Sequence, residues 1–453
     1  MKKRVISIVC VALALVLIGV VLFFLISKKD DNFDASTVEV NVNLPKDTTA
    51  SLKVGIMDDA SERTTMNAFI EGFNKLYPNI EVTLDIISGD YQQGMLSRVK
   101  TQTLPDVFWV GDNNVSYFAE KKLLLNLDTH LDASGFEISD YYESMIKLGQ
   151  KNQNGSQYML PRDYNKVVVF YNKALLEQAG IKPGDPLYPV DGWKYETFLE
   201  LCAVLRAKLD STVYPVDAML AWPPVFNSFV RSFGGELMNV EGKPAFNTPE
   251  AKQGLDAMKE LLDKRYTINP ITKTEEIFLA KKAAMWFTVR PMVSSCETAN
   301  LEYDAVTFPE LGTSPKIGAG TSGYGISRRT KLPNEAFAFL NYMISEDGQE
   351  AFSKTGNAVP VLKSLQENGT WTVVPQPQQF FNHSAFIKYN ERDCLKDYLN
   401  NVNVELYSDI DGAMLDLLDR YMGWTYDKPE SEADLLAVLD RKVKDINKIL
   451  NSD

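Results

Sequence analysis

The sequence predicts an α/β protein of at least two domains, preceded by an apolar N-terminal segment. The chain has 453 residues, more than a single hydrophobic core usually contains. Between residues 52 and 87, two short apolar runs flank a stretch whose apolar residues recur at helical spacing. This strand-helix-strand order is typical of parallel strands joined by a right-handed crossover. Hydrophobic residues make up 45% of the chain and charged residues 24%, which are ordinary values for a globular protein.

Composition and motifs argue against several classes of protein. The net charge of −13 argues against a nucleic-acid-binding protein, which needs a basic face. Cys10 lies in the apolar N-terminal run, and Cys202, Cys296 and Cys394 form no CxxC or Cys/His cluster. We therefore expect no metal site and no disulfide scaffold. Residues 318–323 match GxGxxG, but a predicted strand follows them instead of a helix, so we expect no dinucleotide cofactor.

The N-terminus carries the features of a membrane anchor. Residues 2–4 are basic, and residues 5–26 form a run of 22 residues without charge. At about 1.5 Å per residue, a helix of this length spans roughly 33 Å, enough to cross a bilayer core. Signal-peptide cores are shorter and end in a small-residue cleavage site, which we do not find. We predict an uncleaved transmembrane anchor over residues 1–29 with the remaining chain outside the cell, and cleavage at an atypical site is the alternative.

A polar tether is predicted over residues 30–50, and the first domain then opens with the strand-helix-strand unit. Ligands of such sheets bind at the carboxyl ends of the strands, where Asp59 lies. A helix over residues 91–101 follows, and then a strand that contains Trp109 and ends in a turn at Asp112. We take Asp59, Trp109 and Asp112 as candidate ligand-binding residues. The alternatives are core packing for Trp109 and an Asx-turn for Asp112.

Four polar or aromatic residues, Arg162 to Asn165, stand between Pro161 and a strand predicted to be buried at residues 167–170. Polar groups in such a place are costly unless they are partnered or await a ligand. Asp163 and Tyr164 are therefore candidate ligand contacts. An ion pair between Arg162 and Asp163 that closes a turn is the alternative.

The second half of the chain adds three candidates. Trp222 stands in an aromatic turn beside two prolines, Arg290 ends a predicted buried strand, and Tyr324 begins a strand after a glycine-rich loop. The alternative to ligand binding is packing at a corner of the hydrophobic core for Trp222, and a salt bridge to a neighbouring acid for Arg290. The other elements predicted here are helices at 172–179, 193–209, 247–264 and 432–450, and strands at 283–290, 306–309 and 324–327.

A series of short motifs follows in a distinctive order along the chain. They are Phe73-x3-Tyr77-Pro78, Pro105-Asp106-Val107-Phe108, Leu160-Pro161-Arg162-Asp163, Tyr171-Asn172-Lys173, Phe246-Asn247-Thr248-Pro249-Glu250, Lys282-Ala283-Ala284-Met285 and Gly323-Tyr324-Gly325-Ile326-Ser327. In this order they resemble the family 1 extracellular solute-binding proteins of bacterial ABC transporters, in the carbohydrate-binding branch. The resemblance runs from about residue 52 to residue 450.

The resemblance implies a two-lobed periplasmic-binding-protein-like fold with three hinge crossings, which binds its ligand between the lobes. The crossings are expected near residues 161–165, 308–310 and 359–362. Lobe one is then expected over residues 52–161 plus 310–358, and lobe two over residues 162–309 plus 359–453.

The resemblance also implies that a sugar is held by stacking on aromatic rings and by hydrogen bonds from charged or amide groups of both lobes. The candidates for these roles are Asp163, Tyr164, Asp112, Trp222, Arg290, Tyr324, Trp109 and Asp59. The sequence departs from the family in two places. Many relatives carry a glycine and then an aromatic residue where this chain has Val289, Arg290 and Pro291, so Arg290 is expected to replace that platform. The usual lipidated cysteine is missing, and the apolar anchor is expected to take its role.

We therefore expect an extracellular binding protein that captures a sugar or oligosaccharide and delivers it to the permease subunits of an ABC importer in the membrane. It is expected to be a monomer, held at the membrane by its N-terminal helix, with no cofactor and no catalysis. One alternative is a binder of a charged solute, such as a polyamine or a polyol phosphate. Others are a surface glycoside hydrolase, which needs two carboxylates across the scissile bond, and a sensor that presents bound sugar to a receptor.

Overall fold

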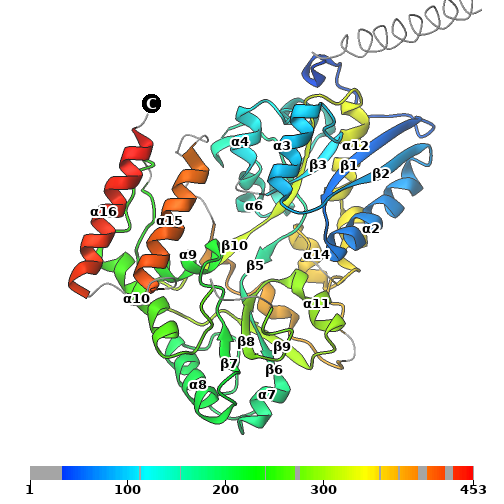
Figure 1. Cartoon of the computed structure of the whole chain (residues 1–453). Coiled ribbons are helices and arrows are strands. Elements are labelled where there is room, and N and C mark those ends of the chain that lie inside the picture. The colour runs from blue at the N-terminus through cyan, green and yellow to red at the C-terminus, as the bar shows by residue number, and fades with distance from the viewer. Residues whose placement is uncertain are drawn as a thin grey trace, which may run out of the picture.

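The computed structural model describes residues 33–111, 114–153, 155–239, 241–270, 276–356, 359–375, 378–395, 406–423 and 432–451. They form an α/β protein with two main sheets and a small third one (Figure 1). We call the part built on the five-stranded sheet the first lobe, and the part built on the four-stranded sheet the second lobe. In Figure 1 the first lobe lies at the upper right and the second at the lower centre.

The first lobe contains the predicted strand-helix-strand unit. Its five strands run in the order β2-β1-β3-β11-β4. β1 and β2 pair in parallel from Ala50 opposite Ile80 to Met57 opposite Ile87, which confirms that prediction. β11 lies antiparallel between β3 and β4, although it comes much later in the chain. The bounds are β1 (Ala50–Met57), α2 (Ala60–Leu76), β2 (Ile80–Ile87), α3 (Tyr91–Thr101), β3 (Val107–Gly111), β4 (Leu160–Pro161) and β11 (Ser322–Ile326).

The second lobe is built on a sheet in the order β7-β8-β6-β9. Every residue of β6, β8 and β9 is buried, as the apolar sequences of the first two strands predict. The bounds are β6 (Val168–Asn172), α7 (Lys173–Gln178), α8 (Tyr195–Lys208), β7 (Tyr214–Asp217), α9 (Pro223–Ser232), α10 (Pro249–Asp263), β8 (Ala283–Thr288), α11 (Val293–Thr298) and β9 (Tyr303–Thr307).

The remaining helices cover the two lobes. α15 packs on both α16 and α10, so the C-terminal pair extends the second lobe (Figure 1). The predicted C-terminal helix is confirmed. The bounds are α4 (Val115–Glu120), α5 (Asp128–Ser134), α6 (Glu143–Leu148), α12 (Pro333–Ile344), α13 (Glu346–Ser353), α14 (Lys363–Asn368), α15 (Tyr407–Met422) and α16 (Glu432–Leu450), with short 3₁₀ turns at Ala35–Thr37, Ile138–Asp140, Lys151–Gln153, Arg290–Met292, His383–Phe386 and Asn390–Arg392.

A small sheet in the order β12-β10-β5 lies where the chain passes between the lobes. Its strands are β5 (Asn165–Lys166), β10 (Ile317–Gly320) and β12 (Asp393–Cys394). Tyr164 and Val359 form an antiparallel bridge, which brings the first and third expected crossings side by side.

The second crossing lies later in the chain than the sequence suggested. Phe308 and Leu311 are buried in the core of the second lobe, with the helices α8 and α9. The chain enters the first lobe only after β10 ends at Gly320. Thr321 connects β10 to β11, which begins at Ser322 in the sheet of the first lobe. The expected crossing near residues 308–310 is therefore wrong, because apolar contacts hold this stretch in the second lobe. The remaining lobe boundaries stay a prediction.

The predicted polar tether is wrong for residues 33–49, because this stretch is docked on the first lobe. Arg328 Nε lies 3.0 Å from both carboxylate oxygens of Asp34, and Arg328 Nη2 donates to Asp34 Oδ2 at 2.7 Å. This pairing holds the pKa of the Asp34 carboxyl well below its usual range. The next residue, Ala35, is buried.

The predicted anchor over residues 1–29 lies outside the described residues. Within the described part of the chain, no helix combines the length and the apolar character needed to cross a membrane.

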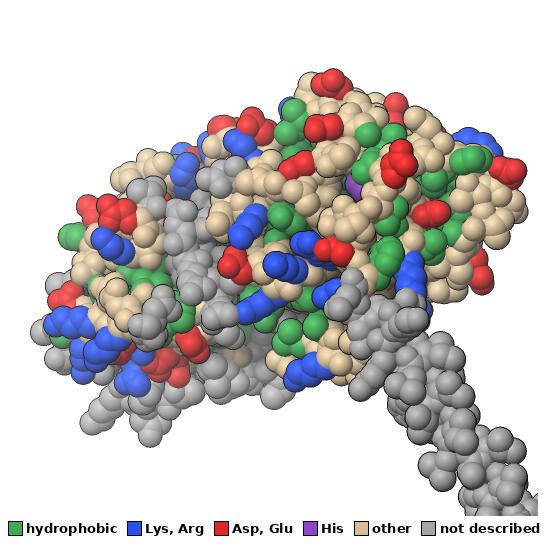
Figure 2. Space-filling model, turned by 90° about the horizontal axis from the view of Figure 1, so that it is seen from above, with side chains coloured by type: hydrophobic (Ala, Val, Ile, Leu, Met, Phe, Trp, Pro, Cys, Tyr) green, Lys and Arg blue, Asp and Glu red, His purple; other side chains and the backbone are tan. Residues whose placement is uncertain are grey.

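Figure 2 shows the protein from above, and on this face Lys and Arg side chains are interspersed with Asp and Glu. Among the residues described there, the basic side chains form no continuous patch, in keeping with the acidic composition.

Candidate ligand-binding site

A cleft of about 390 Å³ lies between the two lobes. The first lobe contributes residues from the end of β3 and the start of β11, and the second lobe contributes the N-terminus of α9 and the residue after β8. The small sheet and the first crossing supply the rest. The lining residues are Trp109, Gly111, Asn165, Val167, Trp222, Pro223, Pro224, Val289, Gly318, Ala319, Gly320, Thr321 and Ser322.

None of these described lining residues carries a charge. The wall is largely apolar and contains two indole rings, a side-chain amide, two hydroxyls and the backbone of three glycines. This combination of apolar surface with few polar groups is typical of small-molecule sites.

Two polar atoms of the lining are buried without a hydrogen-bond partner. They are the indole Nε1 of Trp109, a donor, and the side-chain oxygen of Asn165, an acceptor. Buried polar groups normally have partners, because an unmet hydrogen bond costs free energy. Within the described residues, one donor and one acceptor of the lining residues are therefore left without a protein partner.

Close packing of α9 on β10 fixes one wall of the cleft. A Cβ atom on Gly318 would lie 2.2 Å from the carbonyl oxygen of Pro224, so only glycine permits this approach. Ser228 Oγ accepts from Gly318 N at 2.7 Å and donates to Pro224 O at 2.6 Å. These contacts hold the first turn of α9, with Trp222 before it, at the edge of the cleft.

Of the predicted site residues, Trp109 and Trp222 line the cleft, one from each lobe. Their contact with a ligand remains a prediction. Asp112 lies outside the described residues, although its neighbour Gly111 is in the lining. The other predicted residues have different positions.

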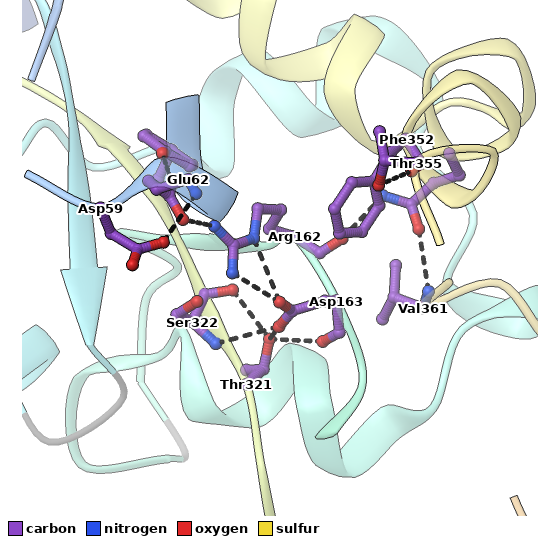
Figure 3. Close-up of polar contacts among 11 residues, drawn as sticks. Asp59, Glu62, Arg162, Asp163, Thr321, Ser322, Phe352, Thr355 and Val361 are labelled. Atoms are coloured by element: carbon purple, nitrogen blue, oxygen red, sulfur yellow. Dashed lines mark hydrogen bonds and ion pairs between the residues drawn. The ribbon is translucent and has the colours of Figure 1, made fainter. Parts of the chain in front are cut away.

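Asp163 lies behind the cleft wall in a buried ion-pair network (Figure 3). Arg162 donates to Asp163 Oδ2 from Nε at 3.1 Å and from Nη2 at 2.6 Å, and its Nη1 pairs with Glu62. Although burial opposes the charge, these two carboxylates raise the pKa of Arg162 well above its ordinary value. The role of Asp163 as a direct ligand contact is thus not supported, because its carboxylate already has an internal partner.

The same network reaches the cleft through its neighbours. Thr321 Oγ1 donates to the Asp163 carbonyl at 2.6 Å, and Ser322 N lies 3.4 Å from Asp163 Oδ1. Thr321 and Ser322 both line the cleft. These contacts of Asp163, drawn in Figure 3, hold Thr321 and Ser322 in place.

Tyr324 and Asp59 also differ from the prediction. Tyr324 is fully buried, and its hydroxyl donates to Glu62 at the start of α2 instead of facing the cleft. Asp59 is the N-cap of α2, where its Oδ1 accepts from Glu62 N at 2.9 Å. Neither residue is in the cleft lining, so both have structural roles at the start of this helix.

Tyr164 belongs to the first crossing and is fully buried. Its hydroxyl donates to Asp393 Oδ2 at 2.5 Å, and its ring stacks on Tyr142 with centroids 5.1 Å apart. The predicted ligand contact by Tyr164 is not supported, because the side chain points into this polar cluster.

Arg290 is fully buried in a cage of aromatic rings. Its guanidinium carbon lies 5.2 to 5.4 Å from the ring centroids of Trp371, Phe381 and Phe386. Arg290 Nε donates to the Gly356 carbonyl at 2.8 Å. Burial lowers the pKa of Arg290 to about 10. The prediction that Arg290 replaces the aromatic platform is wrong, because the side chain turns away from the cleft and only the preceding Val289 lines it.

Sequence reasoning missed several lining residues. Asn165 belongs to the polar run after Pro161, but the run does not reveal which member faces the cleft. Pro223 and Pro224 follow Trp222 directly, and this neighbourhood was a usable signal. The glycines of residues 318–320 were visible as a motif, yet their place against α9 depends on the tertiary structure.

Comparison with known families shows the family of this chain. Residues 59–350, which are more than half of the chain, match the family described as bacterial extracellular solute-binding protein. The chain belongs to this family. A lactose-binding protein from Rhizobium radiobacter is similar to this solute-binding protein, with 27% identity over 353 residues that cover 73% of this chain and 76% of the relative.

Solved structures share the fold of this solute-binding protein. An ABC substrate-binding protein from Listeria monocytogenes, in complex with cycloalternan, has a TM-score of 0.74 and 18% identity and covers 89% of this chain and 100% of that one. UgpB from Mycobacterium tuberculosis, in complex with glycerophosphocholine, has a TM-score of 0.71 and 18% identity and covers 89% of this chain and 99% of that one. These similarities show the two-lobed α/β fold of periplasmic binding proteins.

Proposed function

We propose that this solute-binding protein captures a neutral sugar or oligosaccharide between its lobes and delivers it to an ABC importer. The observation that carries the proposal is the cleft lining. It combines two tryptophans from opposite lobes with two unpartnered hydrogen-bonding atoms, and its described residues are uncharged.

The chemistry of this lining matches a carbohydrate. The C–H face of a sugar ring packs well on an indole, which both Trp109 and Trp222 offer. Sugar hydroxyls donate and accept hydrogen bonds, so they can satisfy both Trp109 Nε1 and Asn165 Oδ1. The volume of about 390 Å³ falls within the range of small-molecule sites.

The relatives support a sugar ligand. Besides the lactose-binding protein, a melibiose/raffinose/stachyose-binding protein from Bacillus subtilis is 25% identical over 166 residues, 35% of this chain and 34% of the relative. The rival ligand is a charged solute, because the structurally similar UgpB holds glycerophosphocholine. The uncharged lining favours the neutral ligand, since a buried ion needs an opposite charge or several hydrogen bonds.

A glycoside hydrolase is less consistent with this site. Such enzymes need two carboxyl groups about 5–10 Å apart across the bond that breaks. The described lining offers no carboxylate, and Asp163 behind it is paired with Arg162. We propose binding and release without catalysis, in which the ligand favours a closed arrangement of the lobes.

The site of action is proposed to be the outer face of the cell membrane. The family is extracellular, and the uncharged run over residues 5–26 would hold this monomeric protein at the membrane beside the permease subunits. The intact mass of the exported protein tests whether this N-terminal segment is retained.

A thermal-shift screen tests the ligand class. The panel contains lactose, raffinose, maltose, glycerophosphocholine and spermidine. A ligand at about 100 times its Kd stabilises a protein by roughly 2.7 kcal/mol, so we expect a clear rise in Tm with a neutral sugar. Trp222→Ala should abolish the rise, whereas Phe380→Ala, which removes an exposed aromatic side chain outside the lining, should preserve it. A rise with glycerophosphocholine or spermidine alone would overturn the neutral-sugar assignment.

A further inference from the structure

The N-terminus of α9 forms part of the cleft. This helix has 10 residues, and its N-cap Trp222 and first two residues, Pro223 and Pro224, all line the cleft. The first turn of an α-helix normally exposes N–H groups that lack partners within the helix. Such N–H groups, together with the partial positive charge that they carry, are a common binding site for phosphate and other anions.

At α9 these donors are absent or already used. Pro223 and Pro224 have no backbone N–H. The next two amides, of Val225 and Phe226, donate to the Trp222 carbonyl at 2.9 and 3.2 Å. The amide of Trp222 itself donates to the Met219 carbonyl at 2.8 Å. The first turn therefore presents no free N–H to a ligand, although it faces the cleft.

The helix α10 begins differently. α10 also starts with a proline, Pro249, but its N-cap Thr248 accepts a hydrogen bond from Ala251 N at 3.2 Å. At α9, as at α12 with Pro333, no side chain caps the helix, but α9 carries two prolines in its first turn. The pair of prolines removes the need for a cap, and it leaves an apolar surface in the cleft where other helix ends leave donors.

We propose that Pro223 and Pro224 are specificity-determining residues that make the cleft reject anionic solutes, such as sugar phosphates, while it accepts neutral ones. The inference rests on the proposed function and adds a means of discrimination to it. An anion entering the cleft loses hydration, and it finds neither a free N–H at α9 nor a charged side chain in the described lining. A neutral sugar has much less hydration to lose, and it packs on the proline rings and on Trp222.

Restoring the two amides tests the proposal. The double substitution Pro223→Ala and Pro224→Ala adds two N–H groups at the start of α9, and alanine retains a good helical conformation. We expect inorganic phosphate to bind this variant at least tenfold more tightly than the wild type, as measured by calorimetric titration of the full chain and by ³¹P line broadening. Each single substitution restores one donor, so it should give a smaller gain in phosphate affinity. The single variants also provide the test if the double variant does not fold.

Pro249→Ala is the matched control, because it makes the same change at an exposed helix start outside the cleft. It should gain no affinity for phosphate. Equal phosphate affinity in the wild type and the double variant, or an equal gain in Pro249→Ala, would overturn the proposal. Inorganic phosphate as the probe keeps this result separate from the sugar screen. If no sugar binds but the double variant gains phosphate affinity, the proposed ligand fails while the role of the prolines stands.

Discussion

Tyr91 fixes the position of Trp109 in the cleft wall. The two rings meet edge to face, with centroids 5.1 Å apart and planes at 83°. The Tyr91 hydroxyl donates to the Trp109 carbonyl at 2.8 Å. Pairing of β3 with β1 ends at Phe108, so Tyr91 supports the strand where that pairing stops. We infer that it is a positioning residue for the indole.

Substitutions of Tyr91 separate the ring contact from the hydrogen bond. Tyr91→Leu loses both, and we expect sugar affinity to fall by about 1 to 2 kcal/mol, the usual combined size of such contacts. Tyr91→Phe keeps the ring and should recover most of this loss. Labelling with 5-fluorotryptophan gives a direct check, with the Trp109 signal assigned by Trp109→Phe. A ¹⁹F signal of Trp109 that is unchanged in Tyr91→Leu would contradict the positioning role.

For single residues, the sequence predicted the type of residue better than the direction in which its side chain points. The sequence places Trp109 within a strand, with core packing as the alternative, and Trp222 in a turn beside two prolines, and the structure puts both in the cleft lining. Arg290 at a strand end and Tyr324 after a glycine-rich loop are candidates from the sequence, but both side chains are buried among partners distant in the sequence. Tyr324 reaches Glu62, which is 262 positions away, and no local pattern encodes that contact.

At the scale of elements, the first and third crossings are joined by Gln349 of α13. This side chain is fully buried. Its Nε2 donates to the Arg162 carbonyl at 2.8 Å and to the Met343 carbonyl at 2.9 Å. Its Oε1 accepts from Val361 N at 2.8 Å. One amide thereby ties residues of two separate crossings to the first lobe.

Gln349→Glu should destabilise the protein. The change removes two donations and places a carboxylate in a buried site, and each unmet polar group of this kind costs about 1–3 kcal/mol. We expect the free energy of unfolding to fall by about 3 kcal/mol in urea denaturation. Gln178→Glu, on the exposed side of α7, should change it by less than about 0.5 kcal/mol. Similar values for the two variants would show that the bridge contributes little.

Local signals predicted the elements well. The helix predicted over residues 91–101 is α3, and the apolar residues at helical spacing near the C-terminus form α16. The second crossing was misplaced because its position depends on the packing of Phe308 and Leu311 in the core of the second lobe. The docked segment after residue 33 was missed for the same reason, since the partner of Asp34 is 294 positions away.

At the scale of the whole molecule, the cleft is divided between two lobes that meet at the crossings. Trp109 belongs to the first lobe and Trp222 to the second. A bound sugar can therefore contact both indole rings only if it bridges the two lobes. A bridging ligand stabilises the closed arrangement by the difference in its affinity for the two states. Binding of a neutral sugar and closure of the lobes are therefore expected to occur together.

The distance between the lobes is the most direct test. Glu120 in the first lobe and Lys243 in the second have side chains that are 49% and 64% exposed, so Glu120→Cys and Lys243→Cys accept spin labels. The described native cysteines, Cys202, Cys296 and Cys394, are buried and should stay unlabelled. Pulsed electron resonance of the labelled protein should show a shorter distance when the sugar found in the thermal-shift screen is added. It should show no shortening in the Trp222→Ala background. An unchanged distance at saturating sugar would contradict binding between the lobes.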